Sequence, residues 1–395
     1  MRFLVNAILF VFTKVFRIHA NIPKEVKNIK GPYLLLGNHI GTYDPFIISY
    51  FINQPAHFVS SDAVFRDPMI GFLFKKLGVI PKQKNARDTQ VIRDMLGVAK
   101  AGGAIGLFPE GTRSWIGTTL PFDPVIAKLV KLLNITVITA RMKGMQLSNP
   151  RWGGKLRRSK VEIDYQIAIS KKDIKKASLE EILSIIKKNL AHDEVDYQRK
   201  QMNRIHSQFR AEYIEYVLFL CSQCNSLGQL KSRGNDFYCQ SCQHKIHINP
   251  YGFFEANNLP FDNIRDAYLW QHKQFEAFIE VHFHRKTKAI IFKDQSLFIY
   301  QEIAEKMILQ GEATAYFYID RILLEFTNGK QQVFYLNEIN MINPQFQEKI
   351  ELNYKGKNYR FVGKTPGISG IKWEMATSVI WKLTGQRAKI SLYLE

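Results

Sequence analysis

The sequence has few cysteines, fewer acidic than basic residues, and no long apolar run. All four cysteines fall between residues 221 and 242, so none is left over elsewhere in the 395 residues. The N-terminal apolar run, residues 3–16, is shorter than the roughly 20 residues of a membrane-spanning helix, and Lys14 interrupts it. There is no internal repeat and no low-complexity segment. A hydrophobic content of 46% and an aromatic content of 13% exclude a disordered chain, and the length predicts two or three domains.

The shortage of acidic residues lies mainly in the first part of the chain. Residues 1–250 hold 37 Lys and Arg against 19 Asp and Glu, a net charge of +18, whereas residues 251–395 hold 18 against 16. A basic region suits a polyanionic partner: an anionic membrane surface, a phosphorylated substrate, an acidic carrier protein or nucleic acid. A solvated lysine-rich surface is the alternative, because charge alone identifies no partner.

Residues 1–20 predict a helix that lies in the interface of a membrane. At about 100° per residue, one narrow stripe of this helix carries the polar residues Arg2, Asn6, Thr13 and Arg17. The other residues are mainly Phe, Leu, Ile and Val, which suit the headgroup boundary. Two alternatives stay open: a secretory signal cleaved near Ala20, against which Lys14 argues, and a helix of the protein core.

Residues 21–175 alternate between short apolar runs and amphipathic segments. This alternation predicts an α/β fold in which helices flank a mixed sheet. The expected strands are 33–38, 56–61, 78–82, 104–107, 135–142 and 161–169. The expected helices are 44–53, 65–78, 86–102 and 122–133, and Asp-Pro pairs open several of them.

The remaining chain divides into four predicted segments. Residues 176–218 read as a helical linker that begins with a capping box and continues, after a break near His192, to residue 220. Residues 219–248 hold the cysteines, and 249–285 form a second helical linker. Residues 286–395 alternate apolar runs with turn signals before a final helix, which predicts a β-rich domain similar to a pleckstrin-homology-like barrel.

His39 and Asp44 lie five residues apart, where an apolar run ends. Histidine is the usual general base near neutral pH, and a carboxylate bonded to its other ring nitrogen fixes the tautomer and stabilises the protonated form. The residues between them include no serine or cysteine nucleophile. The pair therefore predicts activation of a hydroxyl group brought by the substrate, although the spacing alone also fits a structural role.

Residues 107–114, LFPEGTRS, leave a second apolar run and enter a turn. Gly111 permits a positive φ, so backbone N–H groups can point toward an anion, and the planar fork of Arg113 suits phosphate. Thr112 adds a hydroxyl group, and Glu110 is expected to hold Arg113 or to accept a substrate hydroxyl. An ordinary turn with a surface Arg–Glu pair is the alternative.

Together the two segments resemble the glycerolipid acyltransferase family, whose best-known members are 1-acylglycerol-3-phosphate acyltransferases. Asn38, His39 and Asp44 match its Asn-His-x4-Asp block. Residues 108–114 match its Phe-Pro-Glu-Gly-Thr-Arg-Ser block at every position, and the resemblance covers about residues 1–200. It implies a layered acyltransferase fold.

The resemblance also implies a mechanism and a set of partners. His39, oriented by Asp44, would take the proton from the free hydroxyl of 1-acylglycerol 3-phosphate, and the product would be phosphatidic acid. The acyl donor would be acyl-CoA or an acyl-carrier-protein thioester. Backbone N–H groups near the pair would hold the developing oxyanion. The implied substrate-binding residues are Asn38, Lys84, Glu110, Gly111, Thr112 and Arg113.

Two positions depart from the family pattern. Lys84 stands where the second block has arginine, so a point charge replaces a bidentate fork, and Arg87 lies nearby. Thr136 and Thr139 stand where the fourth block has prolines. The fourth block tends to shape the acyl pocket, so the preferred chain length is not predicted. Neither departure removes a catalytic group.

The cysteines resemble a zinc ribbon: Cys221-x2-Cys224-x14-Cys239-x2-Cys242. Two Cys-x-x-Cys pairs supply the four thiolates of a structural zinc site, with no position open for catalysis. Two disulfides and a rubredoxin-like iron are the alternatives; a reducing cytosol argues against the disulfides. A bound metal supplies folding energy that so small a module lacks.

These interpretations converge on a membrane-associated acyltransferase at the cytoplasmic face of the cell membrane, peripheral or monotopic. Its expected partners are an anionic membrane surface, a lysophospholipid and an acyl thioester; nucleic acid is not expected. The basic segment 151–160 reads either as a contact for anionic headgroups or as a solvated hairpin tip. The alternative functions are acylation of another lysolipid or hydroxyl-bearing amphiphile, and a non-catalytic, basic zinc-ribbon protein that binds nucleic acid.

Overall fold

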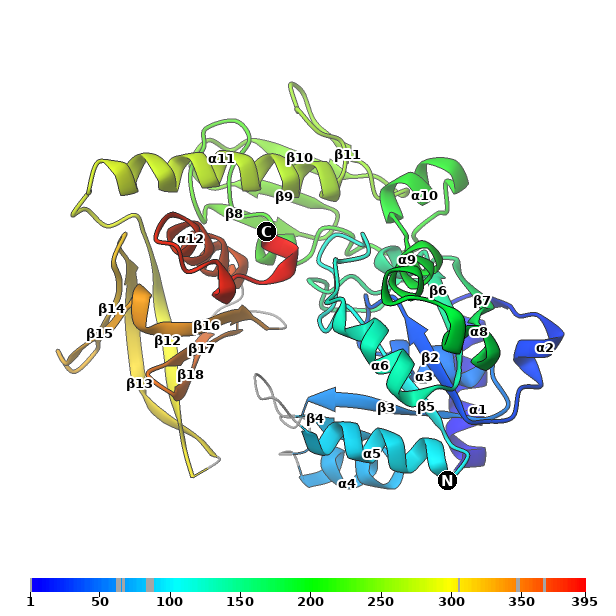
Figure 1. Cartoon of the computed structure of the whole chain (residues 1–395). Helices are drawn as coiled ribbons and strands as arrows, with labels where there is room; N and C mark the ends of the chain where they lie inside the picture. Colours follow the sequence, from blue (N-terminus) through cyan, green and yellow to red (C-terminus); the bar gives the residue numbers. More distant parts are fainter. Residues whose placement is uncertain are drawn as a thin grey trace. The chain divides into compact units, whose positions relative to one another are not determined.

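The computed structural model describes residues 2–61, 65, 68–82, 89–304, 306–345, 349–364 and 367–395, except the side chains of 2–4 and 68–70 (Figure 1). Contacts divide the chain into two compact units. The first is Met1–Arg151 with Arg157–Ile205, and the second is Trp152–Leu156 with His206–Glu395. Among the described helices, none has both the length and the apolar character needed to cross a membrane.

A seven-stranded sheet forms the centre of the first unit. Its strand order is β1-β7-β6-β2-β5-β3-β4. The β6–β7 pair is antiparallel and the other neighbouring pairs are parallel, which confirms the predicted α/β fold with a mixed sheet. The strands are β1 (Ile18–Asn21), β2 (Tyr33–Gly37), β3 (Ala56–Ser61), β4 (Ile80–Lys82), β5 (Ala104–Leu107), β6 (Thr136–Lys143) and β7 (Val161–Ile169).

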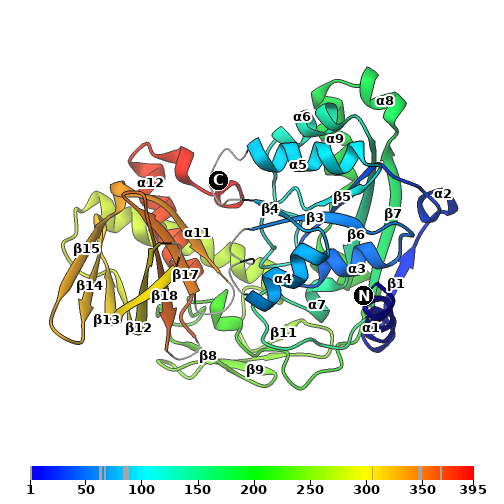
Figure 2. The same cartoon turned by 90° about the horizontal axis from the view of Figure 1, so that it is seen from below.

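Helices cover both faces of this sheet, which explains why the central strand β2 is apolar throughout. Leu34 and Leu36 pack into one core with α5, α6, α8 and α9, whereas Tyr33 and Leu35 pack into a second core with α3. Figure 2 shows these helices on opposite sides of the strands. The helices are α1 (Arg2–Val15), α2 (Lys24–Lys27), α3 (Asp44–Tyr50), α4 (Pro68–Lys76), α5 (Thr89–Lys100), α6 (Val125–Leu133), α7 (Met145–Ser148), α8 (Lys171–Lys176), α9 (Leu179–Leu190) and α10 (Glu194–Gln201).

The two predicted motifs meet because their strands are parallel neighbours. In the pairing of β2 with β5, Leu36 lies beside Leu107. Residues 38–43 leave the carboxyl end of β2, and residues 108–124 leave the carboxyl end of β5. Both loops therefore emerge at one edge of the sheet, where open α/β sheets commonly place their ligand sites.

The second unit holds two antiparallel sheets and two long helices. A four-stranded sheet has the order β11-β10-β9-β8, and a seven-stranded sheet has the order β15-β14-β13-β12-β18-β17-β16. The rings of Phe292 and Phe317 pack against Trp373 of the last helix. These sheets confirm a separate β-rich region; its likeness to a pleckstrin-homology barrel stays a prediction.

The elements of the second unit are bounded as follows. The strands are β8 (Leu230–Arg233), β9 (Asp236–Cys239), β10 (Lys245–Ile248), β11 (Phe254–Glu255), β12 (Phe292–Ile303), β13 (Lys306–Phe317), β14 (Arg321–Phe326), β15 (Gln331–Tyr335), β16 (Ile339–Pro344), β17 (Lys349–Tyr354) and β18 (Lys357–Gly363). The helices are α11 (Ile264–His284) and α12 (Gly370–Leu383), with short 3-10 turns at Ile214–Tyr216, Leu336–Glu338, Arg387–Lys389 and Leu392–Leu394.

The N-terminal helix is shorter than predicted. Helix α1 ends at Val15, Arg17 adopts a left-handed φ of 53°, and β1 then pairs in parallel with β7. Thr13, expected on the polar stripe, is buried. Exposed large apolar side chains on α1 are Ile8, Phe10, Val11 and Val15, and Lys14 is exposed beside them. The packing of α1 on the first unit therefore buries Thr13 of the polar stripe and leaves Asn6, Arg17 and several apolar side chains exposed.

In the predicted helical linker 176–218, α-helices form only in the first part. The Ser178–Glu181 capping box is present, and the break near His192 separates α9 from α10. The predicted helix over 211–220 is wrong, because only a short 3-10 turn forms there, after Tyr213 with a left-handed φ of 68°. Its apolar side chains are buried on all sides, and Gln271 bonds the backbone of 217–220 in place of helical partners.

The basic segment 151–160 is neither a solvated hairpin tip nor wholly exposed. Arg151, Trp152 and Arg157 are buried. The backbone N–H of Arg157 bonds the carbonyl of Ser148, and the Ser148 hydroxyl bonds the carbonyl of Arg157. These three side chains therefore do not face headgroups, which corrects the sequence interpretation of this segment.

Candidate active site and metal centre

His39 and Asp44 meet where β2 passes into α3, as their spacing predicted. Nδ1 of His39 lies 3.0 Å from Oδ2 of Asp44, whose side chain is fully buried. The same oxygen accepts hydrogen bonds from the backbone N–H of Ile40 (2.7 Å) and Gly41 (2.8 Å). A carboxylate with these donors accepts Nδ1–H of the ring, which leaves Nε2 to take a proton.

These bonds change two expectations. Asp44 is the first residue of α3, and its carboxylate bonds the preceding loop instead of capping the helix. The N–H groups of Ile40 and Gly41 are occupied by Asp44, so they do not serve an oxyanion. A Cβ on Gly41 would lie 2.9 Å from Oδ1 of Asp44 and 2.7 Å from Nδ2 of Asn149, so this glycine is needed for close approach.

The second motif clamps the backbone of His39. Oε1 of Glu110 accepts a hydrogen bond from the His39 N–H (2.8 Å), and the Ser114 N–H donates to the His39 carbonyl (2.8 Å). Oε2 of Glu110 accepts from the Leu120 N–H (2.8 Å). Burial raises the pKa of Glu110 to about 8, although the two backbone bonds oppose this shift. Glu110 thus joins the two loops through backbone groups, which the sequence did not indicate.

The imidazole rests on a stack of aromatic rings. The ring centroids of His39 and Phe108 are 4.1 Å apart and the rings are nearly parallel, and Phe58 stacks on Phe108 with the centroids 5.5 Å apart. Burial lowers the pKa of His39 from its usual value; the Asp44 carboxylate opposes this, while the positive charges of Arg113 and Arg151 reinforce it. The His39 side chain is still 20% exposed, so a largely neutral, reachable base results.

The predicted anion-binding turn has the expected backbone. Gly111 has φ +68°, a conformation that side chains rarely adopt. Nη1 of Arg113 donates to the Thr42 hydroxyl (2.8 Å), which brings the guanidinium to the loop between His39 and Asp44. The Thr112 hydroxyl accepts a hydrogen bond from Arg151 (3.1 Å). The sequence did not indicate this contact, because Arg151 lies 39 residues beyond Thr112 and belongs to no recognisable motif.

Of the other predicted substrate-binding residues, the structure describes Asn38 but not Lys84. Asn38 is buried, and its side chain bonds the backbone N–H (2.7 Å) and carbonyl (2.9 Å) of Met142. Asn38 thereby holds the end of β2 against β6, directly before His39 in the chain. Lys84, and Arg87 beside it, lie outside the described residues.

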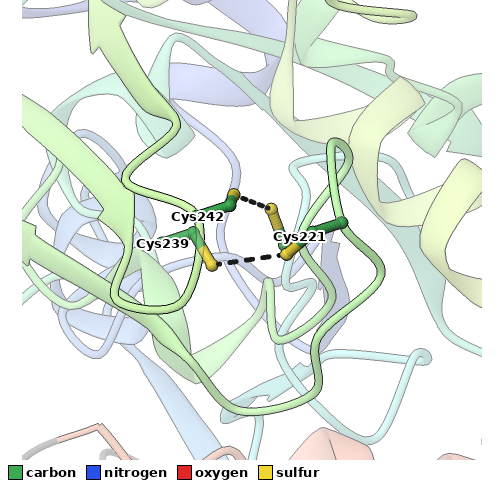
Figure 3. Close-up of side chains that lie close together, drawn as sticks. Cys221, Cys239 and Cys242 are labelled. Carbon is green, nitrogen blue, oxygen red and sulfur yellow. Dashed lines mark hydrogen bonds between the residues drawn. The ribbon is translucent and has the colours of Figure 1, made fainter.

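The four cysteines converge in the second unit, as predicted. Their sulfur atoms all lie within 4.8 Å of one another, and Figure 3 shows the labelled three turned toward a common point. Cys221 and Cys224 flank a turn closed by Asn225 at φ 57°; Cys239 ends β9, and Cys242 lies in a turn closed by Gln243 at φ 60°.

The distances between the sulfur atoms fit a metal better than disulfides. Sγ of Cys221 lies 3.7 Å from Sγ of Cys242, and Sγ of Cys224 lies 3.8 Å from Sγ of Cys239. A disulfide needs about 2.05 Å. A tetrahedron of thiolates about 2.3 Å from zinc separates its sulfurs by about 3.8 Å. The four cysteines can therefore hold one metal ion.

Comparison with known proteins finds similarity in part of the first unit. Residues 15–143 match the family model Acyltransferase. The chain is 31% identical over 104 residues to a 1-acyl-sn-glycerol-3-phosphate acyltransferase of Borreliella burgdorferi, covering 26% of this chain and 40% of that protein. It is 26% identical over 115 residues to the chloroplastic 1-acyl-sn-glycerol-3-phosphate acyltransferase BAT2 of Brassica napus, covering 29% of this chain and 33% of that protein. The chain thus spans less than half the length of these curated relatives.

A solved structure is similar to part of the chain. The 1-acyl-sn-glycerophosphate (LPA) acyltransferase PlsC from Thermotoga maritima aligns with a TM-score of 0.41 and 19% sequence identity. The alignment covers 47% of this chain and 75% of that chain.

Proposed function

We propose that this chain, whose residues 15–143 form an acyltransferase-family domain, transfers an acyl group from a thioester to the free hydroxyl of 1-acylglycerol 3-phosphate, making phosphatidic acid. The observation that carries the proposal is the His39–Asp44 contact of 3.0 Å beside the Arg113 turn. A base without a protein nucleophile suits direct attack by the acceptor hydroxyl. The names of the two relatives support the phosphate-bearing acceptor.

The proposed reaction proceeds in one displacement. Nε2 of His39 removes the proton of the acceptor hydroxyl, whose oxygen attacks the thioester carbonyl carbon. The new C–O bond forms, the C–S bond breaks, and the imidazolium returns its proton to the leaving thiolate. Asp44 stabilises the imidazolium through Nδ1, and Arg113 binds the acceptor phosphate.

A lysolipid panel tests this assignment. The full chain is incubated with lysophospholipids of different headgroups, with either acyl-CoA or an acyl-carrier-protein thioester, and the products are read by mass spectrometry. We expect phosphatidic acid from 1-acylglycerol 3-phosphate at a rate at least about tenfold above that of any other acceptor. Preference for another lysolipid would replace the proposed acceptor. Absence of transfer to every acceptor would favour a non-catalytic binding protein.

Coenzyme A and an acidic carrier protein are both anionic donors, and three helices of the first unit expose lysines that could attract them. Helices α6, α8 and α9 expose seven lysines: Lys128, Lys171, Lys172, Lys175, Lys176, Lys187 and Lys188. Both coenzyme A and an acidic carrier protein are polyanions, so these lysines support either donor. The two arms of the panel distinguish them.

We also propose that the first unit binds the cytoplasmic face of the cell membrane, as a peripheral or monotopic protein. Exposed apolar side chains of α1 and α4 flank α3: Ile8, Phe10, Val11 and Val15 on α1, and Phe72 and Leu73 on α4. Ring contacts link them through α3, since Phe12 packs on Tyr43 and Phe46 packs on Phe74. Asp44 begins α3, so an acceptor lipid in that membrane lies near the base.

Flotation with anionic vesicles tests this membrane face. The double variant Val11→Ser with Phe72→Ser is expected to weaken vesicle binding at least about tenfold, because each buried apolar side chain contributes about 1.5–3 kcal/mol. Val125→Ser is the matched control, since Val125 is 56% exposed on α6, across the sheet from α1 and α3. Equal flotation of the double variant and the wild type would exclude α1 and α4 as the docking face.

For the metal centre we propose structural zinc. Four cysteine thiolates at tetrahedral spacing are the donor set that zinc prefers, and they leave no ligand position for substrate. The ion would hold the two cysteine turns together and take no part in acyl transfer.

A further inference from the structure

Arg151 is a buried arginine that contacts the predicted phosphate-binding turn. It is 4% exposed and lies three residues after α7. Its Nη1 donates to the Thr112 hydroxyl (3.1 Å) and to the Arg113 carbonyl (2.5 Å). One guanidinium therefore holds two consecutive residues of the turn.

The Arg151 guanidinium also lies over a ring in the next part of the same loop. Its central carbon is 3.8 Å from the ring centroid of Trp115, which is itself buried. The neighbouring Gln146 donates from Nε2 to the Trp115 carbonyl (2.9 Å). The segment after β6 thus braces residues 112–115 at several points. A lysine could carry the charge of Arg151, but it lacks the planar surface that stacks on the indole ring and the fork that reaches the turn.

Two arginines thus lie beside the same turn, and their positive charges favour the binding of an anion there. Arg113 reaches back to Thr42 in the loop that carries the base, while Arg151 holds the Arg113 backbone from behind. The positive charges of Arg113 and Arg151 both lower the pKa of His39. The two arginines thus have different tasks. The Arg113 side chain reaches the loop that carries His39, and Arg151 fixes the position of the Arg113 backbone.

We propose that Arg151 is a positioning residue that fixes the Thr112–Arg113 turn, so that the enzyme selects acceptors bearing a phosphate. The inference rests on the proposed function and extends it to a residue outside the family motifs. Because Arg151 acts through the turn, its loss weakens phosphate recognition and leaves the His39–Asp44 pair in place.

Kinetics with a charged and an uncharged acceptor test this role. In Arg151→Lys and Arg151→Met, we expect KM for 1-acylglycerol 3-phosphate to rise about 10- to 100-fold while kcat changes only a few-fold, corresponding to loss of about one or two charge-assisted hydrogen bonds. The kcat/KM for uncharged 1-acylglycerol should stay within about threefold of the wild-type value. Arg157→Lys is the matched control, because Arg157 is an equally buried arginine of the same segment, and its KM should not change.

Thermal unfolding first establishes which variants are folded, and Arg151→Lys is the variant expected to keep the fold if Arg151→Met does not. An equal loss of kcat/KM for both acceptors, or an unchanged KM in Arg151→Lys, would overturn the inference. Calorimetric titration with glycerol 3-phosphate separates this failure from failure of the proposed function. If the wild type acylates neither acceptor but binds glycerol 3-phosphate more tightly than Arg151→Lys does, Arg151 keeps its role; equal binding removes it.

Discussion

Replacing His39 with alanine is expected to abolish acyl transfer while the protein stays folded. The imidazole is the only group that the proposed mechanism uses to move a proton, and general acid–base catalysis contributes about 10²–10⁴-fold. The His39 backbone remains held by Glu110 and Ser114, so the loops that form the site keep their positions. Single-turnover rates with 1-acylglycerol 3-phosphate, together with a thermal unfolding curve, measure both parts of the prediction.

Two variants control for this result. Asp44→Asn keeps the size of the side chain but removes the charge that stabilises the imidazolium, so we expect an intermediate loss. His57→Ala removes a histidine of the same sheet that bonds the Gly78 carbonyl, and it should retain activity within a few-fold. A folded His39→Ala protein that still turns over at near wild-type rate would refute the mechanism.

The pH dependence follows from the lowered pKa of His39. The neutral ring is the active form, so kcat/KM should fall only below the usual imidazole pKa of about 6.5. The same shift affects stability: below about pH 6.5 the unfolded chain binds the proton more readily than the folded chain, so the His39 contribution is complete above that pH and is lost as the pH falls. His39→Ala should flatten this part of the stability profile, which denaturant unfolding at several pH values measures. An acid limb of kcat/KM centred well above pH 6.5 would contradict the lowered pKa.

Removal of the metal is expected to unfold the cysteine module of the second unit. Apparent binding energies of structural zinc in small modules are about 10–16 kcal/mol, more than the stability of most domains. We expect one zinc per chain by elemental analysis. Chelation, or Cys242→Ser, should release it and make residues 221–242 sensitive to protease.

Ser241→Ala is the matched control, because Ser241 is exposed in the same turn and supplies no thiolate. It should keep both the metal and the protease resistance. Iron in place of zinc would change the identity of the ion and leave its structural role. A Cys242→Ser protein that retains a full equivalent of metal and resists protease would show that the four cysteines do not form the site.

The features predicted correctly depend on neighbours in the sequence. His39 and Asp44 lie within one turn, Gly111 needs only its own backbone freedom, and each Cys-x-x-Cys pair closes a local loop. The apolar run of β2 likewise predicts a strand that is covered on both faces. Such signals are local, because short stretches of backbone and nearby side chains determine them.

The wrong predictions concern features that depend on contacts between residues far apart in the sequence. The segment 211–220 has a helix-like composition, yet its side chains are buried on all sides, so packing overrode local preference. The basic segment 151–160 looked like a surface, yet Arg151 packs under the Thr112–Arg113 turn. Glu110 looked like a partner for Arg113, yet it bonds the His39 N–H from 71 residues away.

The sequence alone determined the candidate residues: a histidine–aspartate pair, a glycine turn with an arginine, and four cysteines at metal-ligand spacing. Only the tertiary structure decided how the first two combine into one site, because parallel pairing of β2 with β5 brings their loops to the same edge of the sheet. It also placed Arg151 against the Thr112–Arg113 turn. Contacts between residues far apart in the chain arise from the packing of whole elements, and no local pattern of residues encodes that packing.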